Sequence, residues 1–206
     1  DPYAPQFGAA LRAIAPAHPD VLMLSAHIPD GIAFRRAFVA AGLHVGAFIG
    51  TTMAQCVPDF GRDLGAEAYG VFASDRPDGA LNPAGLQPAA RALYASFSRE
   101  WQQRTGSTPD EEAISGFSAT WVLVHDVLPE APSLAPAGVI AAARALNLPE
   151  GSLPNGAGVR FATTGPQVGQ NLLAAATVDE WGPGGEHAVW PQTYATGGVT
   201  LSPSTQ

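Results

Sequence analysis

The sequence predicts an α/β fold organised around a parallel sheet. Three short apolar runs, at residues 20–25, 47–50 and 69–73, are bounded by turn residues and have the length of buried strands. Segments with helical spacing of apolar residues lie between them, and the connections are short. Because strand, helix and strand alternate in this way, we expect right-handed crossovers that make neighbouring strands parallel.

Helices are predicted by apolar periodicity and by the residues at their ends. Phe7, Leu11 and Ile14 share one helical face, and this first helix precedes the strand at residue 20. A second helix has Pro29 in its first turn and Gly42 just past its end, the positions where these residues are best tolerated. The later helices are expected near residues 58–64, 90–101, 114–128 and 135–146.

The strand patterns differ along the chain. The run at residues 20–25 is apolar throughout, which is typical of a parallel strand covered on both faces. After residue 149, strand-like patterns return at residues 158–161, 172–181 and 187–190, separated by Gly and Pro turns. Between residues 74 and 88, Asp, Pro, Gly and Asn cluster without periodicity, and such a stretch suits a hinge or crossover.

Composition and charge exclude several classes of protein. The 206 residues have a formal net charge of -8, and the ten basic residues are all Arg. These residues are scattered, whereas nucleic-acid binding needs clustered positive charge, so we expect no nucleic-acid partner. The absence of Lys excludes Schiff-base chemistry and a Walker-type phosphate loop. No apolar run approaches the ~20 residues that cross a bilayer, so we expect a globular chain.

Motifs for catalysis, metal binding and cofactor binding are not found. The five histidines lack ligand spacing, so no metal site is predicted. Cys56 is the single cysteine, and we expect an inert, partly buried thiol unless a histidine base lies beside it. Residues 110–112 are three consecutive acids, but their place before an apolar helical face predicts a helix N-terminus. We therefore predict neither an enzyme nor a cofactor.

Small and hydroxylated residues follow two successive strands of the predicted sheet. Ligands of open α/β sheets bind beyond the carboxyl ends of the strands, where loops converge and helix N-termini offer free N–H groups. The same residue types also suit turns and helix caps, and a histidine at such a place is often only a surface residue. The residues alone leave both interpretations open. The candidate ligand-binding residues are Ser25, Ala26, His27, Gly50, Thr51 and Thr52.

Several segments together resemble the type I periplasmic binding proteins, most of all those of the leucine/isoleucine/valine-binding kind. Each segment is short, but their order and spacing cover nearly the whole chain. The segments are HPDVLMLSAHIPD (18–30), FRRAFVAAG (34–42), IGT (49–51), EAYGV (67–71), FSREWQQRTG (97–106), SGFSA (115–119), GVRF (158–161) and VWP (189–191).

The resemblance implies a two-lobed fold with Rossmann-like parallel sheets, hinge crossovers and an absent N-terminal part. It assigns residues 1–75 to βα units of the second lobe and residues 76–157 to the hinge and the helices of the first lobe. Residues 158–206 would be closing strands that return to the second lobe. Because the helices of residues 88–147 have no matching strands, we expect the missing N-terminal lobe segment to supply their sheet.

The resemblance also implies a function. It predicts reversible capture of a small solute in an interlobe cleft, at a periplasmic or extracellular membrane-associated location, for delivery to an ABC permease. A ligand-sensing regulatory domain on the same fold is the alternative. A secretion signal or lipid anchor upstream of Asp1 would favour transport, and a cytoplasmic start would favour sensing.

The resemblance places ligand contacts on particular residues. His27 matches a position that contacts ligand, and we expect a further contact from Phe117 in the segment that returns to the first lobe. Thr51 or Thr52 matches the region where amino-acid binders place an acid for the ligand ammonium. Because a buried ammonium without a carboxylate is costly, an ordinary aliphatic amino acid is disfavoured. We expect an amino acid-like molecule, an amide or an organic acid.

Overall fold

The chain forms two compact units. The computed structural model describes residues 4–51 and 53–200. The first unit combines Asp1–Asp75 with Thr177–Gln206, and the second unit is Arg76–Ala176. Residues 158–176 thus belong to the second unit, although the sequence assigned them to the returning strands. No helix in the described part of the chain is long and apolar enough to cross a membrane.

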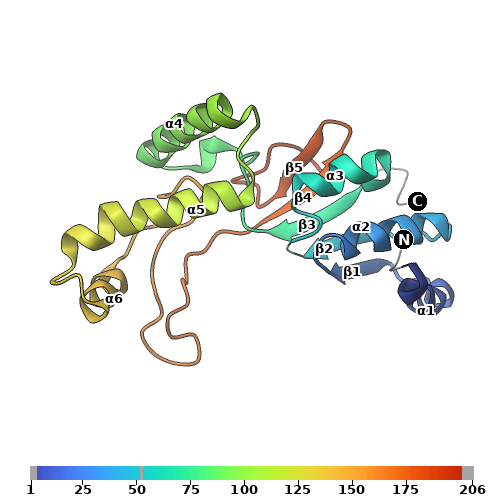
Figure 1. Cartoon of the computed structure of the whole chain (residues 1–206), viewed down its shortest axis with the longest axis horizontal. Helices are drawn as coiled ribbons and strands as arrows, with labels where there is room; N and C mark the ends of the chain where they lie inside the picture. Colours follow the sequence, from blue (N-terminus) through green and yellow to red (C-terminus); the bar gives the residue numbers. More distant parts are fainter. Residues whose placement is uncertain (1–3, 52, 201–206) are drawn as a thin grey trace. The chain divides into compact units, whose positions relative to one another are not determined.

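The first unit is built on a five-stranded mixed sheet in the order β1-β2-β3-β4-β5 (Figure 1). β1 (Val21–Ser25), β2 (Ala47–Thr51) and β3 (Val71–Asp75) are parallel, which confirms the prediction from their alternation with helices. β4 (Thr177–Gly182) is antiparallel to β3, and β5 (Gly185–Trp190) is antiparallel to β4. The returning chain therefore closes the sheet with a hairpin.

The α-helices among the described residues of the first unit share one hydrophobic core with the sheet. These helices are α1 (Ala4–Ile14), α2 (Asp30–Ala40) and α3 (Pro58–Leu64). Phe48 of β2 is fully buried, and its ring lies 5.5 Å from that of Phe38 and 6.2 Å from that of Phe34, both on α2. Burying a side chain of this size contributes about 1.5–3 kcal/mol to the stability of the unit.

The opposite face of the sheet is open at β1. Val21 is 50% exposed and Met23 is 66% exposed, while Leu22 and Leu24 are half-buried towards the core. The prediction that this strand is covered on both faces is wrong for the described residues. An apolar run shows that a strand can be buried on both faces, but whether a face is buried depends on which elements pack over it. The hydrophobic core that α1, α2 and α3 form with the sheet does not include Val21 or Met23.

A buried cation lies inside the core of the first unit. The Arg35 guanidinium is fully buried and sits 5.2 Å from the centre of the Phe48 ring, while its Nε donates to the Glu67 carbonyl at 2.7 Å. Burial lowers the pKa of Arg35 from its ordinary value to about 10, and the nearby Glu67 carboxylate offsets part of this effect. Its Nη1 and Nη2 atoms are buried without a hydrogen-bond partner, so this cation lies beneath the sheet and is not presented at its edge.

The second unit consists of helices and irregular segments. Its helices are α4 (Pro88–Thr105), α5 (Glu111–Val122) and α6 (Pro136–Ala145). Gly106 ends α4 in the left-handed region at φ 77°, and Asp110 caps α5 by accepting a hydrogen bond from the Ala113 N–H at 2.8 Å. The acids of residues 110–112 are therefore a helix start, as predicted.

The described part of the second unit contains no β-strand. The segment at residues 158–161, predicted to be a strand, forms only isolated bridges, in which Val159 pairs with Leu148 and Phe161 with Asn171. Its alternating apolar residues instead pack towards the helices. The period of the pattern was correct, but no neighbouring strand is present to pair with it.

The apolar face predicted for the last part of α5 is shifted. A π-helical turn, Leu123–Val127, follows α5 directly. The extra residue in this turn rotates the side chains that follow. Within this turn Val124 is 59% exposed, while Val127 at its end is 3% exposed. Sequence periodicity assumes a regular helix and does not detect such a turn.

Candidate functional site

The carboxyl ends of β1, β2 and β3 lie side by side and carry a row of hydroxyl side chains. Ser25 is in register with Thr51, and Thr51 is in register with Ser74. Residues in register on neighbouring strands point to the same face of a sheet. Ser25 is exposed, and the other two residues are half-buried. The prediction that the loops after the first two strands are neighbours is confirmed, and we call Ser25, Thr51 and Ser74 the hydroxyl row.

The loop after β1 leads from the hydroxyl row into α2. Ala26 is half-buried and His27 is exposed. The His27 carbonyl accepts a hydrogen bond from the Gly31 N–H at 2.9 Å, which begins the helix. Asp30 lies in the first turn of α2, where its charge complements the helix dipole, and its Oδ1 is buried without a hydrogen-bond partner. The loop and the first turn of α2 therefore carry an imidazole and a carboxylate after Ser25.

Gly50 has a packing role that the sequence did not indicate. It is buried on the helix-facing side of β2, and a Cβ at this position would lie 2.1 Å from the side chain of Gln55. The Gln55 amide is itself fully buried, and neither its nitrogen nor its oxygen has a hydrogen-bond partner. Glycine at residue 50 thus makes room for this amide beneath the row. Its contact with a ligand stays a prediction.

The loop after β2 is held by three hydrogen bonds. The Met53 N–H donates to Cys56 Sγ at 3.1 Å, and the Cys56 thiol donates to Asp75 Oδ2 at 3.1 Å. Trp181 of β4 donates from its indole Nε1 to the Gln55 carbonyl at 2.6 Å. Cys56 is 7% exposed, so the predicted burial is confirmed, and the acid beside it is a hydrogen-bond acceptor. Thr52, another predicted contact, lies outside the described residues.

Phe117 lies in the second unit, on the side of α5 that packs against α4. Its ring stacks on that of Phe97 with centroids 4.1 Å apart and an interplanar angle of 14°. Trp121 continues the aromatic contact along the same side of α5. Helix packing accounts for the position of Phe117 without a ligand, and its role in binding stays a prediction.

Two residues of this edge were missed by the sequence analysis. Ser74 follows the same rule that selected Ser25 and Thr51, because it is a hydroxyl residue near the carboxyl end of a parallel strand. It was assigned to the hinge instead, since the predicted strand stopped at residue 73. Gln55 carries no sequence signal, because only the packing against Gly50 shows that its amide is buried.

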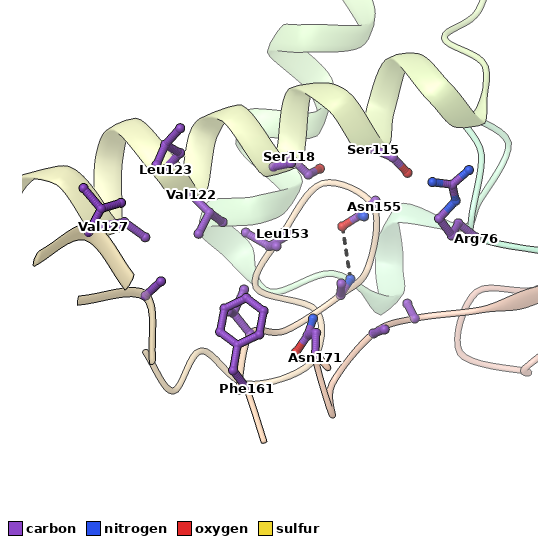
Figure 2. A pocket seen from close by; sticks show the side chains of 17 residues that line it. Arg76, Ser115, Ser118, Val122, Leu123, Val127, Leu153, Asn155, Phe161 and Asn171 are labelled. Atoms are coloured by element: carbon purple, nitrogen blue, oxygen red, sulfur yellow. Dashed lines mark hydrogen bonds between the residues drawn. The ribbon is translucent and has the colours of Figure 1, made fainter. Parts of the chain in front are cut away.

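The second unit contains a separate cavity of about 360 Å³ (Figure 2). Val122, Leu123 and Val127 line it from α5 and the π-helical turn, while Leu153 and Phe161 line it from the irregular chain opposite. Figure 2 shows these apolar side chains at one end and Ser115, Asn155 and Arg76 at the other. The cavity thus has an apolar end and a polar end, and we call it the α5 groove.

Two hydroxyl groups that line the α5 groove lack a hydrogen-bond partner. Asn155 Oδ1 already accepts from the Ala157 N–H at 3.3 Å, the dashed contact in Figure 2, and both the oxygen and the nitrogen of the Asn171 amide are hydrogen-bonded to backbone groups. Arg76 forms an ion pair with Glu111. By contrast, the Oγ atoms of Ser115 and Ser118 are buried without a hydrogen-bond partner. Buried hydroxyl groups normally have a partner, which can be another polar group or a water molecule.

Comparison with known proteins relates the chain to one family. A family model described as periplasmic binding protein matches residues 1–183. No curated protein matches the chain significantly.

Solved structures of low identity share the fold. The leucine-binding protein LivK of Thermotoga maritima is 17% identical, with a TM-score of 0.70 over 88% of this chain and 47% of its own. A putative branched-chain amino acid ABC transporter protein of Silicibacter pomeroyi is 15% identical, with a TM-score of 0.69 over 96% of this chain and 51% of its own. An ABC transporter substrate-binding protein of Desulfitobacterium hafniense, solved with Leu, is 17% identical, with a TM-score of 0.64 over 90% and 48%. The chain therefore spans about half the length of each.

Proposed function

Since the chain belongs to the periplasmic binding protein family, we propose that it forms part of a binding protein that captures a small solute outside the cytoplasm for an ABC permease. The observation that carries the proposal is the hydroxyl row at the carboxyl edge of three parallel strands, where α/β sheets bind their ligands. The similar proteins of known structure, one named leucine-binding and one solved with Leu, support a solute of amino-acid size.

The chemistry of the row favours a ligand with hydrogen-bonding oxygen or nitrogen atoms. Hydroxyl groups both donate and accept, so the three side chains suit a carboxylate, an amide or a neutral polar group. The Arg35 cation is buried beneath the sheet, whereas the exposed His27 imidazole lies in the loop that follows Ser25. We therefore propose an organic acid, an amide or an amino acid-like solute.

Asp30 separates two classes of ligand. Asp30 is the carboxylate nearest in sequence to the loop after β1, and one of its oxygens has no partner. A ligand ammonium would need such an acid, whereas a simple organic acid would be repelled by it. Binding of leucine that is lost in Asp30→Asn would assign the ammonium to Asp30. Tighter binding of an organic acid in the same variant would support the class without ammonium.

The test is a ligand screen on the complete protein by thermal shift and calorimetry. Amino acids, amides and short organic acids are compared, and a true ligand at a hundredfold excess over its Kd stabilises the protein by about 2.7 kcal/mol. Thr51→Val and Ser74→Ala should each raise Kd about 2- to 12-fold, the effect of losing one hydrogen bond. Thr120→Val, an exposed hydroxyl on α5, is the matched control. Tight binding of a ligand that neither Thr51→Val nor Ser74→Ala weakens would contradict the site.

The ligand-sensing alternative differs from transport in the protein that the loaded binding protein acts on. Transport requires that the loaded protein increases uptake through its permease, whereas a sensor acts on another protein without net uptake. Uptake in cells that lack the gene and are complemented with Thr51→Val measures this difference directly.

A further inference from the structure

A small cavity in the first unit lies at the end of the sheet opposite the hydroxyl row. Its volume is about 180 Å³, and two of the five histidines of the chain, His18 and His44, line it. A strand rises about 3.3 Å per residue, so the start of β1 lies roughly 13 Å from Ser25 at its other end. We call this cavity the histidine pocket, and it is separate from the proposed solute site.

The register of the sheet explains why the two histidines share one cavity. His18 stands three residues before Val21, the first residue of β1. His44 stands three residues before Ala47, the first residue of β2, and the two first residues are partners in the parallel pair. Both histidines therefore approach the sheet at the same edge. Ligand spacing along the chain does not reveal this pair, because the pair forms only when the two strands align.

The ends of two helices favour positive charge in the histidine pocket. Ile14 at the end of α1 and Gly42 just past α2 both line it. The last carbonyl groups of a helix lack partners within the helix, and the helix dipole places partial negative charge there. Arg12, the basic residue in the last turn of α1, does not line the pocket. The pocket therefore suits a cation better than a carboxylate or a phosphate.

Both imidazole rings are free to bind such a cation. The side chains of His18 and His44 are exposed, and neither has a hydrogen-bond or ion-pair partner among residues 4–51 and 53–200. His18 follows a 3-10 turn, η1 (Ala15–Ala17), with its backbone in the left-handed region at φ 43°. This conformation is uncommon for residues other than glycine, and it concentrates at functional sites.

We propose that the histidine pocket binds a divalent transition-metal ion such as Zn²⁺ through the imidazoles of His18 and His44. Neutral imidazole is a preferred ligand of these ions, whereas Mg²⁺ and Ca²⁺ prefer oxygen ligands. Within the described part of the chain, no third His, Cys, Asp or Glu side chain joins the pair in a ligand cluster. The pocket has room for water molecules that would complete the coordination.

The bound ion would act as a clamp. It would connect the chain that enters β1 with the chain that enters β2, and it would stabilise the first unit because it binds the folded state alone. This role depends neither on the identity of the solute nor on transport.

Calorimetry with ZnCl₂ on the complete protein tests the site, after removal of metal with EDTA and without an added histidine tag. His18→Asn and His44→Gln should each raise the Kd for Zn²⁺ at least about tenfold, because each removes one ligand. Asparagine tolerates the left-handed backbone of residue 18, so the first substitution preserves the turn. His125→Gln, an exposed histidine of the second unit, is the matched control and should leave the Kd unchanged.

Thermal unfolding guards against a loss of binding caused by misfolding. Without metal, the parent protein and the three variants should unfold at similar temperatures. Saturating ZnCl₂ should raise the Tm of the parent and of His125→Gln by several degrees, and it should raise the Tm of His18→Asn and His44→Gln by less.

Four results would overturn the proposal. No binding of Zn²⁺ to the parent would exclude the site, and binding that neither substitution weakens would place the ion elsewhere. Weakening by only one of the two substitutions would mean that the imidazoles do not share an ion. Displacement of Zn²⁺ by an equal concentration of MgCl₂ would identify a cation attracted only by the net negative charge of the chain.

Discussion

The first unit has a sheet that helices cover on one face, whereas the second unit has three helices and no strand among the described residues. Phe48 in the first unit is fully buried, but Met23 on the opposite face of the same sheet is 66% exposed. In the second unit the same contrast appears between Phe117 of α5, which packs on α4, and Leu123 of the following π-helical turn, which faces an open groove. Each unit therefore completes one layer contact and leaves another face uncovered.

The contrast between covered and uncovered faces separates the surfaces of each unit by what they contribute. Stability within each unit comes from the covered faces, and the uncovered faces are where further polypeptide has most to gain by packing. The proposed solute site belongs to a third class of surface, because the hydroxyl row lies at the carboxyl edge of the strands. Variants at a covered face, at an uncovered face and at this edge should therefore differ in their effects on stability and on binding.

The largest expected effect is on the covered face. Phe48→Ala should lower the free energy of unfolding by about 3–5 kcal/mol, because it opens a cavity among Phe34 and Phe38. Met23→Ala, on the open face, should change it by no more than about 0.5 kcal/mol. Urea unfolding followed by circular dichroism measures both. A cost of several kcal/mol for Met23→Ala would mean that this face is covered in solution.

A smaller effect is expected under the hydroxyl row. Gly50→Ala should cost about 1–3 kcal/mol, since the new methyl group overlaps the buried side chain of Gln55. Adding Gln55→Ala should recover much of this loss, and the double-mutant cycle gives the coupling between the two residues. Gly184→Ala, where a Cβ meets nothing within 4 Å, is the control. Additive losses in the cycle would contradict the packing described for Gly50.

The smallest effect concerns the second unit and depends on pH. Burial raises the pKa of Asp78 above its ordinary value of 3.8, the hydrogen bond from the Ala80 N–H opposes this shift, and the Asp110 charge adds to it. The native state then holds a proton that the unfolded chain has lost, so stability present below pH 3.8 is lost as the pH rises through the folded pKa. Asp78→Asn stays neutral and should escape this loss.

Thermal unfolding from pH 3.5 to pH 7 measures the Asp78 effect. Asp78→Asn should match the parent chain at the acidic end and exceed its Tm by no more than about 4 °C at neutral pH. A variant that is less stable than the parent at pH 7 would mean that the ionised carboxylate is favourable. That result would reverse the sign of the pKa shift.

Much of the fold could be predicted from local patterns. The parallel strands β1, β2 and β3, the helix starts at Pro29 and Asp110, and the end of α4 at Gly106 all follow from periodicity and end residues. The rim with Ser25 and Thr51 followed from the rule that parallel strands end at one edge. The π-helical turn after α5 and the unpaired segment at residues 158–161 could not be predicted, because they depend on neighbours in space.

By itself the sequence determined the order of the elements, the α/β class and the edge where Ser25 and Thr51 meet, because these depend on short-range spacing and on handedness. Only the tertiary structure decided that Ser74 completes the row, that Gly50 accommodates Gln55 and that one side of α5 stays open. These features arise from contacts between residues distant in the chain, and no local pattern encodes which partner a side chain will meet.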